Sequence, residues 1–237
     1  MRITYNHRTV DLYPNNPKEI LLSLSGGTDS ASLLYLTCKY FPEMKIRPYH
    51  MIDIQHPLDT ECSRDVLSWI RTNFPNQQIE ELETHPFDYL DPDFQEEAKR
   101  ELKEHPGSFR TINGVVKILK CRIINRELGK KYPGLLRVTG MSRNPSFKDM
   151  KNYDNKLLFE DREHRRDTEI ETITLDQPYI NVDKKFVAGV FKENNLMDSL
   201  FKLTGSCVGG LVGTNGFTEP CKKCWWCHEK RWAFGEF

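Results

Sequence analysis

Apolar runs alternate with amphipathic stretches along most of the chain, and this alternation defines the expected elements. Buried strands are predicted near residues 19–24, 46–54, 79–82 and 135–140. Helices are predicted over residues 29–40, 60–73, 91–104 and 115–130. Strands that alternate with helices pair in parallel through right-handed crossovers. The pattern therefore predicts an α/β fold with an open, doubly wound and mainly parallel sheet, preceded by a short hairpin over residues 3–13.

A loop of small residues joins the first of these strands to its helix. It consists of Ser25, Gly26, Gly27, Thr28, Asp29 and Ser30. Two glycines let the backbone turn sharply, and the helix then presents its free amides and positive dipole end to an anion. We expect the backbone around Gly26, Gly27 and Thr28, with the hydroxyls of Ser25 and Ser30, to bind the pyrophosphate part of ATP. The alternative is a turn that only connects strand and helix.

Asp29 places a negative charge beside the expected triphosphate. A bound cation relieves that repulsion, so we expect Mg²⁺ here with Asp29 as a direct or water-mediated ligand. The competing interpretation is that Asp29 caps the helix N-terminus, which is compatible with the metal role.

Other polar residues are expected at the same edge, because ligands of open α/β sheets bind beyond the carboxyl ends of the strands. Asp53 follows the second strand and is expected to contact the nucleoside or the acceptor. Arg143 follows a later strand and is expected to stabilise charge on the α-phosphate. Lys120, from a basic group on the helix at 115–130, is a further catalytic candidate. For each of them, a solvent-facing position is the alternative.

Four of the seven cysteines are crowded near the C-terminus: Cys207, Cys221, Cys224 and Cys227. Two Cys-x-x-Cys steps that share Cys224 place three thiolates on one loop, and Cys207 completes a tetrahedral set. Zn²⁺ in a closed, structural site is the first expectation, and an iron–sulfur cluster is the rival. The division expected is a nucleotide-binding unit over residues 1–205 and a zinc-binding tail over 206–237.

Composition narrows the class of protein. The length of 237 residues suits one α/β domain with a small appendage. Lysine and arginine balance aspartate and glutamate at 34 each, which argues against a polyanion-coating protein and makes a nucleic-acid partner unlikely. Without a membrane-length apolar stretch or a signal-peptide core, a soluble cytoplasmic protein is expected. A homodimer is compatible with the sequence.

The loop Ser25–Ser30 resembles the signature of the PP-loop ATP pyrophosphatases, which split ATP into AMP and pyrophosphate. The order of later motifs is similar to the 7-cyano-7-deazaguanine synthases of that superfamily, enzymes of queuosine biosynthesis. These motifs are the run at 177–180, the lysines Lys184 and Lys185 that open a helix, and the cysteine set. The resemblance implies a ligase that uses ATP to convert 7-carboxy-7-deazaguanine and ammonia to the nitrile through an adenylated intermediate.

The chain departs from that family where the acceptor is expected to bind. Residues 117–125 keep only Arg122 and Asn125 of a longer family stretch, and residues 53–56 are a shortened form of another. The charged segment at 148–171 reads as a lid or as a disordered spacer. One alternative is another PP-loop enzyme, a sulfur-transferring modifier or a sulfonucleotide reductase, with Cys62 or Cys121 as its thiol. Another is a nucleic-acid-binding module that uses the basic and tryptophan residues of the tail.

Overall fold

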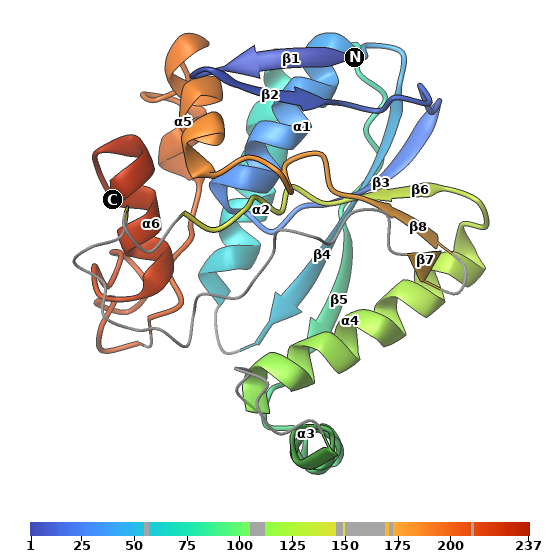
Figure 1. The fold of residues 1–237 in the computed structure, drawn as a ribbon, viewed down its shortest axis with the longest axis vertical. Helices are drawn as coiled ribbons and strands as arrows, with labels where there is room; N and C mark the ends of the chain where they lie inside the picture. Colours follow the sequence, from blue (N-terminus) through green and yellow to red (C-terminus); the bar gives the residue numbers. More distant parts are fainter. Residues whose placement is uncertain (55–56, 105–111, 146–148, 150–168, 171–172, 210) are drawn as a thin grey trace.

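The computed structural model describes residues 1–237 except 55–56, 105–111, 146–148, 150–168, 171–172 and 210. Its centre is a six-stranded sheet in the order β5-β4-β3-β6-β8-β7 (Figure 1). The strands are β3 Glu19–Ser23, β4 Lys45–Asp53, β5 Glu83–Phe87, β6 Leu136–Val138, β7 Glu169–Ile170 and β8 Ile173–Asp176. All neighbouring pairs are parallel except β7 with β8. The predicted α/β fold with a mainly parallel sheet is confirmed.

Helices cover both faces of this sheet. They are α1 Thr28–Tyr40, α2 Pro57–Asn73, α3 Pro92–Glu104, α4 Ile112–Lys131, α5 Lys184–Glu193 and α6 Trp225–Phe234. Side chains of β3 alternate between the faces, as a strand requires. Ile20 and Leu22 join the large core formed with α1, α2 and α5, whereas Leu21 packs with α4. This two-sided burial explains why β3 reads as a continuous apolar run.

Two predicted strands differ in their bounds from those observed. The strand expected at 79–82 lies instead at Glu83–Phe87, and Ile79 makes only an isolated bridge to Ile46. The later strand is shorter than expected, at Leu136–Val138. The N-terminal hairpin is confirmed as β1 Arg2–Tyr5 and β2 Arg8–Asp11, a separate antiparallel pair.

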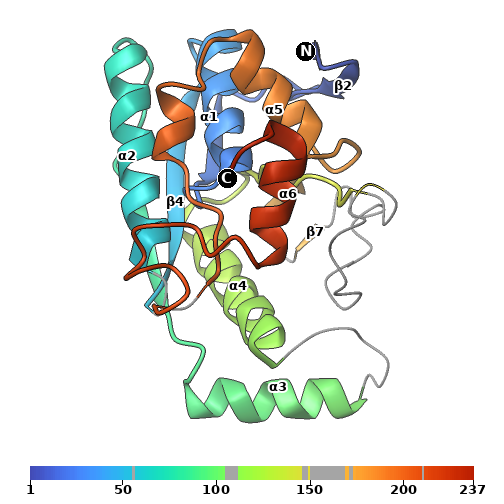
Figure 2. The ribbon, with the colours of Figure 1, turned by 90° about the vertical axis from the view of Figure 1, so that its left-hand side faces the viewer.

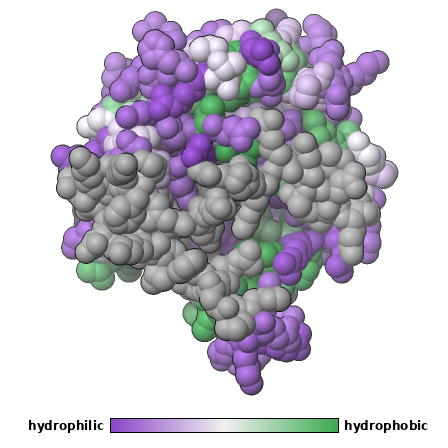
Figure 3. All heavy atoms as spheres, in the orientation of Figure 1, coloured by the Kyte–Doolittle hydropathy of each residue, from purple (hydrophilic) through white to green (hydrophobic). Residues whose placement is uncertain are grey.

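The long helix α4 extends away from the sheet and carries α3 at its far end (Figure 2). This projecting end is hydrophilic on the face seen in Figure 3, consistent with the many charged residues of α3. Most of the charged segment at 148–171 lies outside the described residues. No helix in the described part of the chain has both the length and the apolar character needed to cross a membrane.

The C-terminal helix α6 packs onto the same core as the main sheet. Phe234 lies against Phe201 of the 3-10 helix η2 Leu200–Leu203, with ring centroids 4.7 Å apart, and against Phe191 of α5 at 5.7 Å. The boundary predicted at 205/206 falls in an irregular segment between η2 and the cysteines. The division into two units remains a prediction.

Candidate nucleotide site and cysteine cluster

The glycine-rich loop turns the chain between β3 and α1 with hydrogen bonds of its own. Gly26 has a φ of +76°, and a Cβ there would lie 2.6 Å from the carbonyl oxygen of Asp59, so glycine is required. The amide of Ser25 donates to Ser30 Oγ at 3.1 Å, and that hydroxyl donates to the Gly27 carbonyl, also at 3.1 Å. The loop is therefore preorganised by the chain itself.

A second support lies behind the loop. His50 of β4 is buried, and its Nδ1 lies 2.8 Å from the carbonyl oxygen of Leu24, which only accepts, so this nitrogen carries the proton. Its Nε2 then accepts from the hydroxyl of Thr60 at 3.1 Å. Burial lowers the pKa of His50 below its ordinary value of 6.5. The neutral imidazole of His50 therefore holds Leu24, the residue directly before the loop, in place.

The loop lies at the point where the sheet reverses its strand order. β3 pairs with β4 on one side and with β6 on the other. The segments after β3 and β6 touch, since a Cβ at Gly140 would lie 2.7 Å from the carbonyl oxygen of Asp29. Open α/β sheets bind ligands beyond the carboxyl ends of their strands at such a point. The fold therefore places the loop where a ligand is expected.

Buried polar atoms without a partner follow three adjacent strands at this edge. Within the described residues, no hydrogen bond reaches Thr28 Oγ1 after β3, Thr139 Oγ1 after β6 or Gln177 Oε1 after β8. A buried polar atom left unpaired costs roughly 1–3 kcal/mol, so such atoms usually have a partner. A polar ligand in this crevice would provide those partners.

Asp29 is held by a buried lysine that the sequence analysis did not assign to the site. Both carboxylate oxygens accept from Lys184 Nζ, at 3.0 and 2.9 Å, and one accepts from Ser142 Oγ at 3.1 Å. Lys184 also lies 3.4 Å from Glu229 of α6. Burial favours its neutral amine, but attraction to Asp29 and Glu229 outweighs this and raises the pKa of Lys184. The chain itself therefore supplies a cation beside Asp29, and the Mg²⁺ role of Asp29 stays a prediction.

One local signal in the sequence pointed to Lys184. The residue opens α5 directly after its N-cap Asp183, where a positive charge opposes the helix dipole. A lysine at this unfavourable position is therefore expected to be stabilised by negative groups outside its own helix. In this chain these groups are the pair of carboxylates from α1 and α6.

The remaining predicted residues are spread over the crevice and beyond it. Asp53 is buried at the end of β4. Burial raises the pKa of Asp59 to about 7, and the negative charge of nearby Asp53 adds to this shift. Arg143 is exposed, and its amide donates to the Val182 carbonyl at 2.8 Å. Lys120 pairs with Asp91 at 3.2 Å and lies 3.6 Å from the ring centroid of Phe94, so α3 engages it. The catalytic roles of Arg143 and Lys120 stay predictions.

The four predicted cysteines of the tail come together. The sulfur atoms of Cys207, Cys221, Cys224 and Cys227 all lie within 4.8 Å of one another. Four thiolates at about 2.3 Å from a single zinc ion lie roughly 3.8 Å apart, so the set fits one tetrahedral ion with little adjustment. A Cβ at Gly209 would lie 2.6 Å from Cys221 Cβ, so glycine is needed for this close approach.

Backbone amides already point at these sulfur atoms. Cys207 Sγ accepts from the amides of Gly209 at 3.3 Å and Cys221 at 3.1 Å, and Cys221 Sγ accepts from Cys224 at 3.3 Å. The hydrogen bond from the Cys227 thiol lowers the pKa of Cys224 to about 5. Burial opposes this shift, and neighbouring backbone amides add to it. Its partner Cys227 keeps the proton, so its own pKa is raised. The arrangement therefore favours the thiolate, the form that binds metal, at Cys224.

One helix joins the cysteine cluster to the glycine loop. Cys224 is the N-cap of α6 and Cys227 lies in its first turn. On the same helix, Glu229 contacts Lys184, which in turn holds Asp29. A chain of charged groups, Glu229, Lys184 and Asp29, therefore connects the helix that carries Cys227 to the loop.

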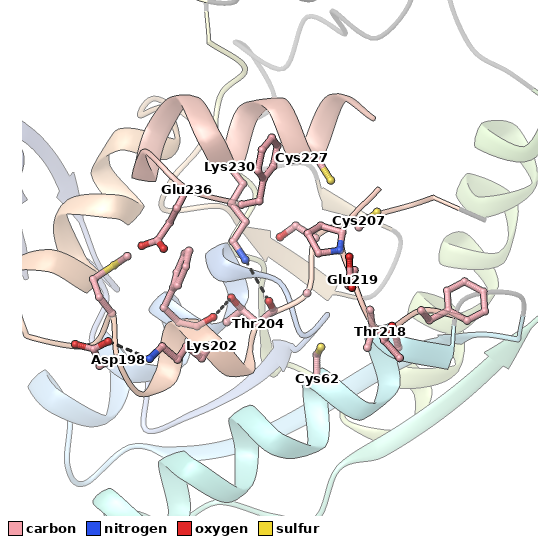
Figure 4. Close-up of a pocket in the computed structure, with 18 residues that line it drawn as sticks. Cys62, Asp198, Lys202, Thr204, Cys207, Thr218, Glu219, Cys227, Lys230 and Glu236 are labelled. Atoms are coloured by element: carbon pink, nitrogen blue, oxygen red, sulfur yellow. Dashed lines mark hydrogen bonds and ion pairs between the residues drawn. The ribbon is translucent and has the colours of Figure 1, made fainter. Parts of the chain in front are cut away.

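A cavity of about 380 Å³ lies between α2, η2 and the tail (Figure 4). Lys230 points into it from α6, and Cys62 points into it from α2. Lys230 is only 9% exposed, and its ammonium donates to the Thr204 carbonyl at 3.3 Å and lies 4.3 Å from the ring centroid of Phe201. Burial lowers the pKa of Lys230 to about 8, and the nearby ammonium of Lys184 adds to this effect.

No protein-family model and no curated protein matches the chain. Among the solved structures that resemble it are three with a TM-score of 0.45 each. The U34-tRNA thiolase NcsA of Methanococcus maripaludis with its [4Fe-4S] cluster is 13% identical, over 91% of this chain and 64% of its own. NMN synthetase of Francisella tularensis is 14% identical, over 94% and 80%, and the glutamine-dependent NAD⁺ synthetase of Acinetobacter baumannii is 15% identical, over 83% and 34%.

This chain thus spans less than two thirds of the thiolase and about a third of the NAD⁺ synthetase. At such low identity and similarity, no activity is inferred from these structures.

Proposed function

We propose that the chain is an AMP-forming enzyme that activates the carboxylate of 7-carboxy-7-deazaguanine with ATP and converts it with ammonia to 7-cyano-7-deazaguanine. The observation that carries the proposal is the preorganised loop at Ser25–Ser30, placed at the switch point of a parallel sheet. Unpaired polar atoms beyond β3, β6 and β8 support a ligand there. The order of the motifs at 177–185 and in the tail supports the deazaguanine acceptor.

In the proposed reaction, the loop holds the β- and γ-phosphates and leaves the α-phosphorus open to attack. A carboxylate oxygen of the acceptor attacks this phosphorus, and pyrophosphate leaves. Ammonia then attacks the acyl carbon, AMP leaves with the transferred oxygen, and one proton is released. A second ATP activates the amide oxygen in the same way. Loss of AMP and a proton from the activated amide gives the nitrile.

The chain's own groups act by position and charge. Amides around Gly26 and Gly27 and the start of α1 orient the outer phosphates. Lys184 is charged and buried beside Asp29, so it holds the end of the loop in one position. Asp29 is the residue that would hold Mg²⁺, directly or through water, and the ion would neutralise the phosphates. Adenylation suits such a site because carboxylate is a poor electrophile and AMP a good leaving group.

We propose Zn²⁺ as the ion of the cysteine cluster. The short sulfur–sulfur distances favour one ion over a multi-iron cluster, which places several atoms between its thiolates. Four protein ligands leave no open position, so the ion would fold the tail. An iron signal in elemental analysis would contradict this assignment.

The state of the other thiols argues against a sulfur-transferring enzyme. Such chemistry needs a reactive thiolate outside the metal cluster. Burial raises the pKa of Cys62 to about 11 and also raises the pKa of Cys121. Burial therefore disfavours the reactive thiolate form of both residues.

The test is a product analysis. Purified protein with Mg²⁺, ATP, ammonia and 7-carboxy-7-deazaguanine is expected to release AMP and pyrophosphate and to form a product with the mass of the nitrile. AMP release without a nitrile would keep the reaction class and reject the acceptor. ADP as the nucleotide product would reject the class.

A further inference from the structure

The cavity beside the tail contains a buried cation, Lys230, that has no carboxylate partner in the described part of the chain. Lys230 contacts the Thr204 carbonyl and the ring of Phe201, and within the described residues no carboxylate lies within ion-pair distance of it. A buried ammonium is costly unless an anion pairs with it. Lys184, the other buried lysine of this region, has two carboxylates. Lys230 therefore differs from Lys184 in having no carboxylate partner.

The carboxylates that line the cavity lie at its exposed rim, and two of the four clustered cysteines, Cys207 and Cys227, also line it. Asp198 pairs with Lys202 at 3.0 Å in solvent, and Glu219 and Glu236 are also exposed. The apolar and aromatic part of the wall consists of Phe201, which is buried, and of four half-buried residues, Leu58, Met197, Phe217 and Phe237. A volume of about 380 Å³ is within the range of small-ligand sites. Such a lining suits a flat, mostly apolar ligand that carries one negative group.

The inner wall of the cavity touches the glycine loop. Cys62 lines the cavity, and its Cβ lies 2.8 Å from where a Cβ at Gly26 would be. Gly205 also lines it, and its amide donates to the Gly26 carbonyl at 3.0 Å. One backbone segment thus separates the cavity from the residues proposed to bind phosphate.

From this geometry we infer that the cavity is the acceptor site and that Lys230 binds the carboxylate of a planar heteroaromatic acid. The inference rests on the proposed function, because it assigns the acceptor of that reaction to a place in the fold. Lys230 pairs with one carboxylate oxygen, and the aromatic wall contacts the ring. Lys230 is thus a substrate-binding residue contributed by the tail, and an intact tail is required for acceptor recognition.

The test compares two ligands on two proteins by calorimetry. The ligands are 7-carboxy-7-deazaguanine and 7-deazaguanine, which lacks the carboxylate. Wild-type protein is expected to bind the acid at least tenfold more tightly, and Lys230→Met to lose this preference while keeping its affinity for the neutral ring. The KM for ATP is expected to change less than twofold. Lys192→Met, on the exposed side of α5, is the matched lysine control and should behave as wild type.

Two further measurements keep the test decisive. Leu58→Trp fills the cavity from α2 without removing the cation, so it should weaken both ligands alike. Lys230→Met should keep the metal and should be at least as stable as wild type, because it removes an unmatched buried charge. Loss of the metal would assign Lys230 to charge balance of the thiolates and overturn the inference, as would an unchanged preference for the acid.

Failure of the proposed function would look different. If wild type binds the acid through Lys230 and yet releases no AMP, the reaction is wrong and the site stands. If Lys230→Met turns over the acid with an unchanged KM, the reaction stands and the site is wrong.

Discussion

The glycine loop and the cysteine segment both contain tight turns, but they are stabilised in different ways. Around the loop, Thr28 and Ser30 are buried, and the hydrogen bonds run between parts of the chain itself. The cysteine segment exposes Leu211 and Val212, the latter at 96%, and its backbone has positive φ at Asn215 and Phe217. A segment with so little apolar burial has few contacts that offset the cost of ordering it. The loop is therefore preorganised by the fold, whereas the segment that carries the cysteines has few packing contacts and would gain order from a metal ion bound by its four sulfur atoms.

Removal of the ion should separate the two regions most clearly. Chelation, or Cys224→Ser, is expected to abolish metal binding and to destabilise the protein by several kcal/mol, because metal binding contributes directly to folding of such sites. Hydrogen exchange should accelerate across residues 206–224 and remain slow in α1. Cys38→Ala, which removes a buried thiol outside the cluster, should keep the metal. Equal loss of protection in α1 and in the tail would contradict the distinction.

The loop should respond to a backbone substitution. Gly26→Ala must adopt a positive φ and place a methyl group against the Asp59 carbonyl, and we expect a loss of about 3 kcal/mol in unfolding free energy together with loss of ATP binding. Gly134→Ala is the matched control, since its φ is +80° and nothing lies within 4 Å of the added methyl. It should cost about 1 kcal/mol. Chemical denaturation measures both, and similar costs would show that the close contact is unimportant.

The charged groups that connect the two regions through Lys184 should have non-additive effects on stability. Asp29→Asn leaves Lys184 with only Glu229 and should cost about 2 kcal/mol of stability as well as abolishing turnover. With Glu229→Gln added, the combined change should differ from the sum by about 0.5 kcal/mol or more. Asp11→Asn breaks an exposed pair with Arg2 and should cost little. Strict additivity would mean that α6 does not act on Asp29 through Lys184.

The smallest effect concerns pH. The unfolded chain protonates His50 near pH 6.5, while the folded protein resists protonation until lower pH because the ring is buried. The unfolded state therefore binds more protons in this window, and stability falls as pH drops below 6.5, by up to about 1.4 kcal/mol per pH unit for one such group. His50→Asn should flatten this dependence in denaturation curves measured between pH 5 and 7. A slope equal to that of wild type would exclude His50 as its source.

Much of this fold could be predicted from local patterns. The strand-loop-helix unit at 19–40 is specified by a continuous apolar run, two glycines and an apolar helix, which act over short distances in the sequence. The crowding of the four cysteines follows from their spacing for the same reason. The strand predicted at 79–82 was misplaced because β5, with the sequence Glu-Thr-His-Pro-Phe, contains no apolar run and buries only Phe87.

The electrostatic part of the site could not be predicted in this way. Lys184 and Glu229 are 45 residues apart in the numbering and meet only after α5 and α6 pack together. Lys230 resembled the basic residues around it in the tail, and nothing local indicated that it alone turns into a cavity. Lys120 is the opposite case. The sequence made it a catalytic candidate, but its ammonium pairs with Asp91 near α3.

The most direct test of the central claim follows one oxygen atom. With ¹⁸O in both carboxylate positions of 7-carboxy-7-deazaguanine, attack on the α-phosphorus must transfer one label to the released AMP, which mass spectrometry of the nucleotide detects. We predict AMP that carries a single ¹⁸O. Label in inorganic phosphate with ADP as the nucleotide product would show attack at the outer phosphate and would contradict the account.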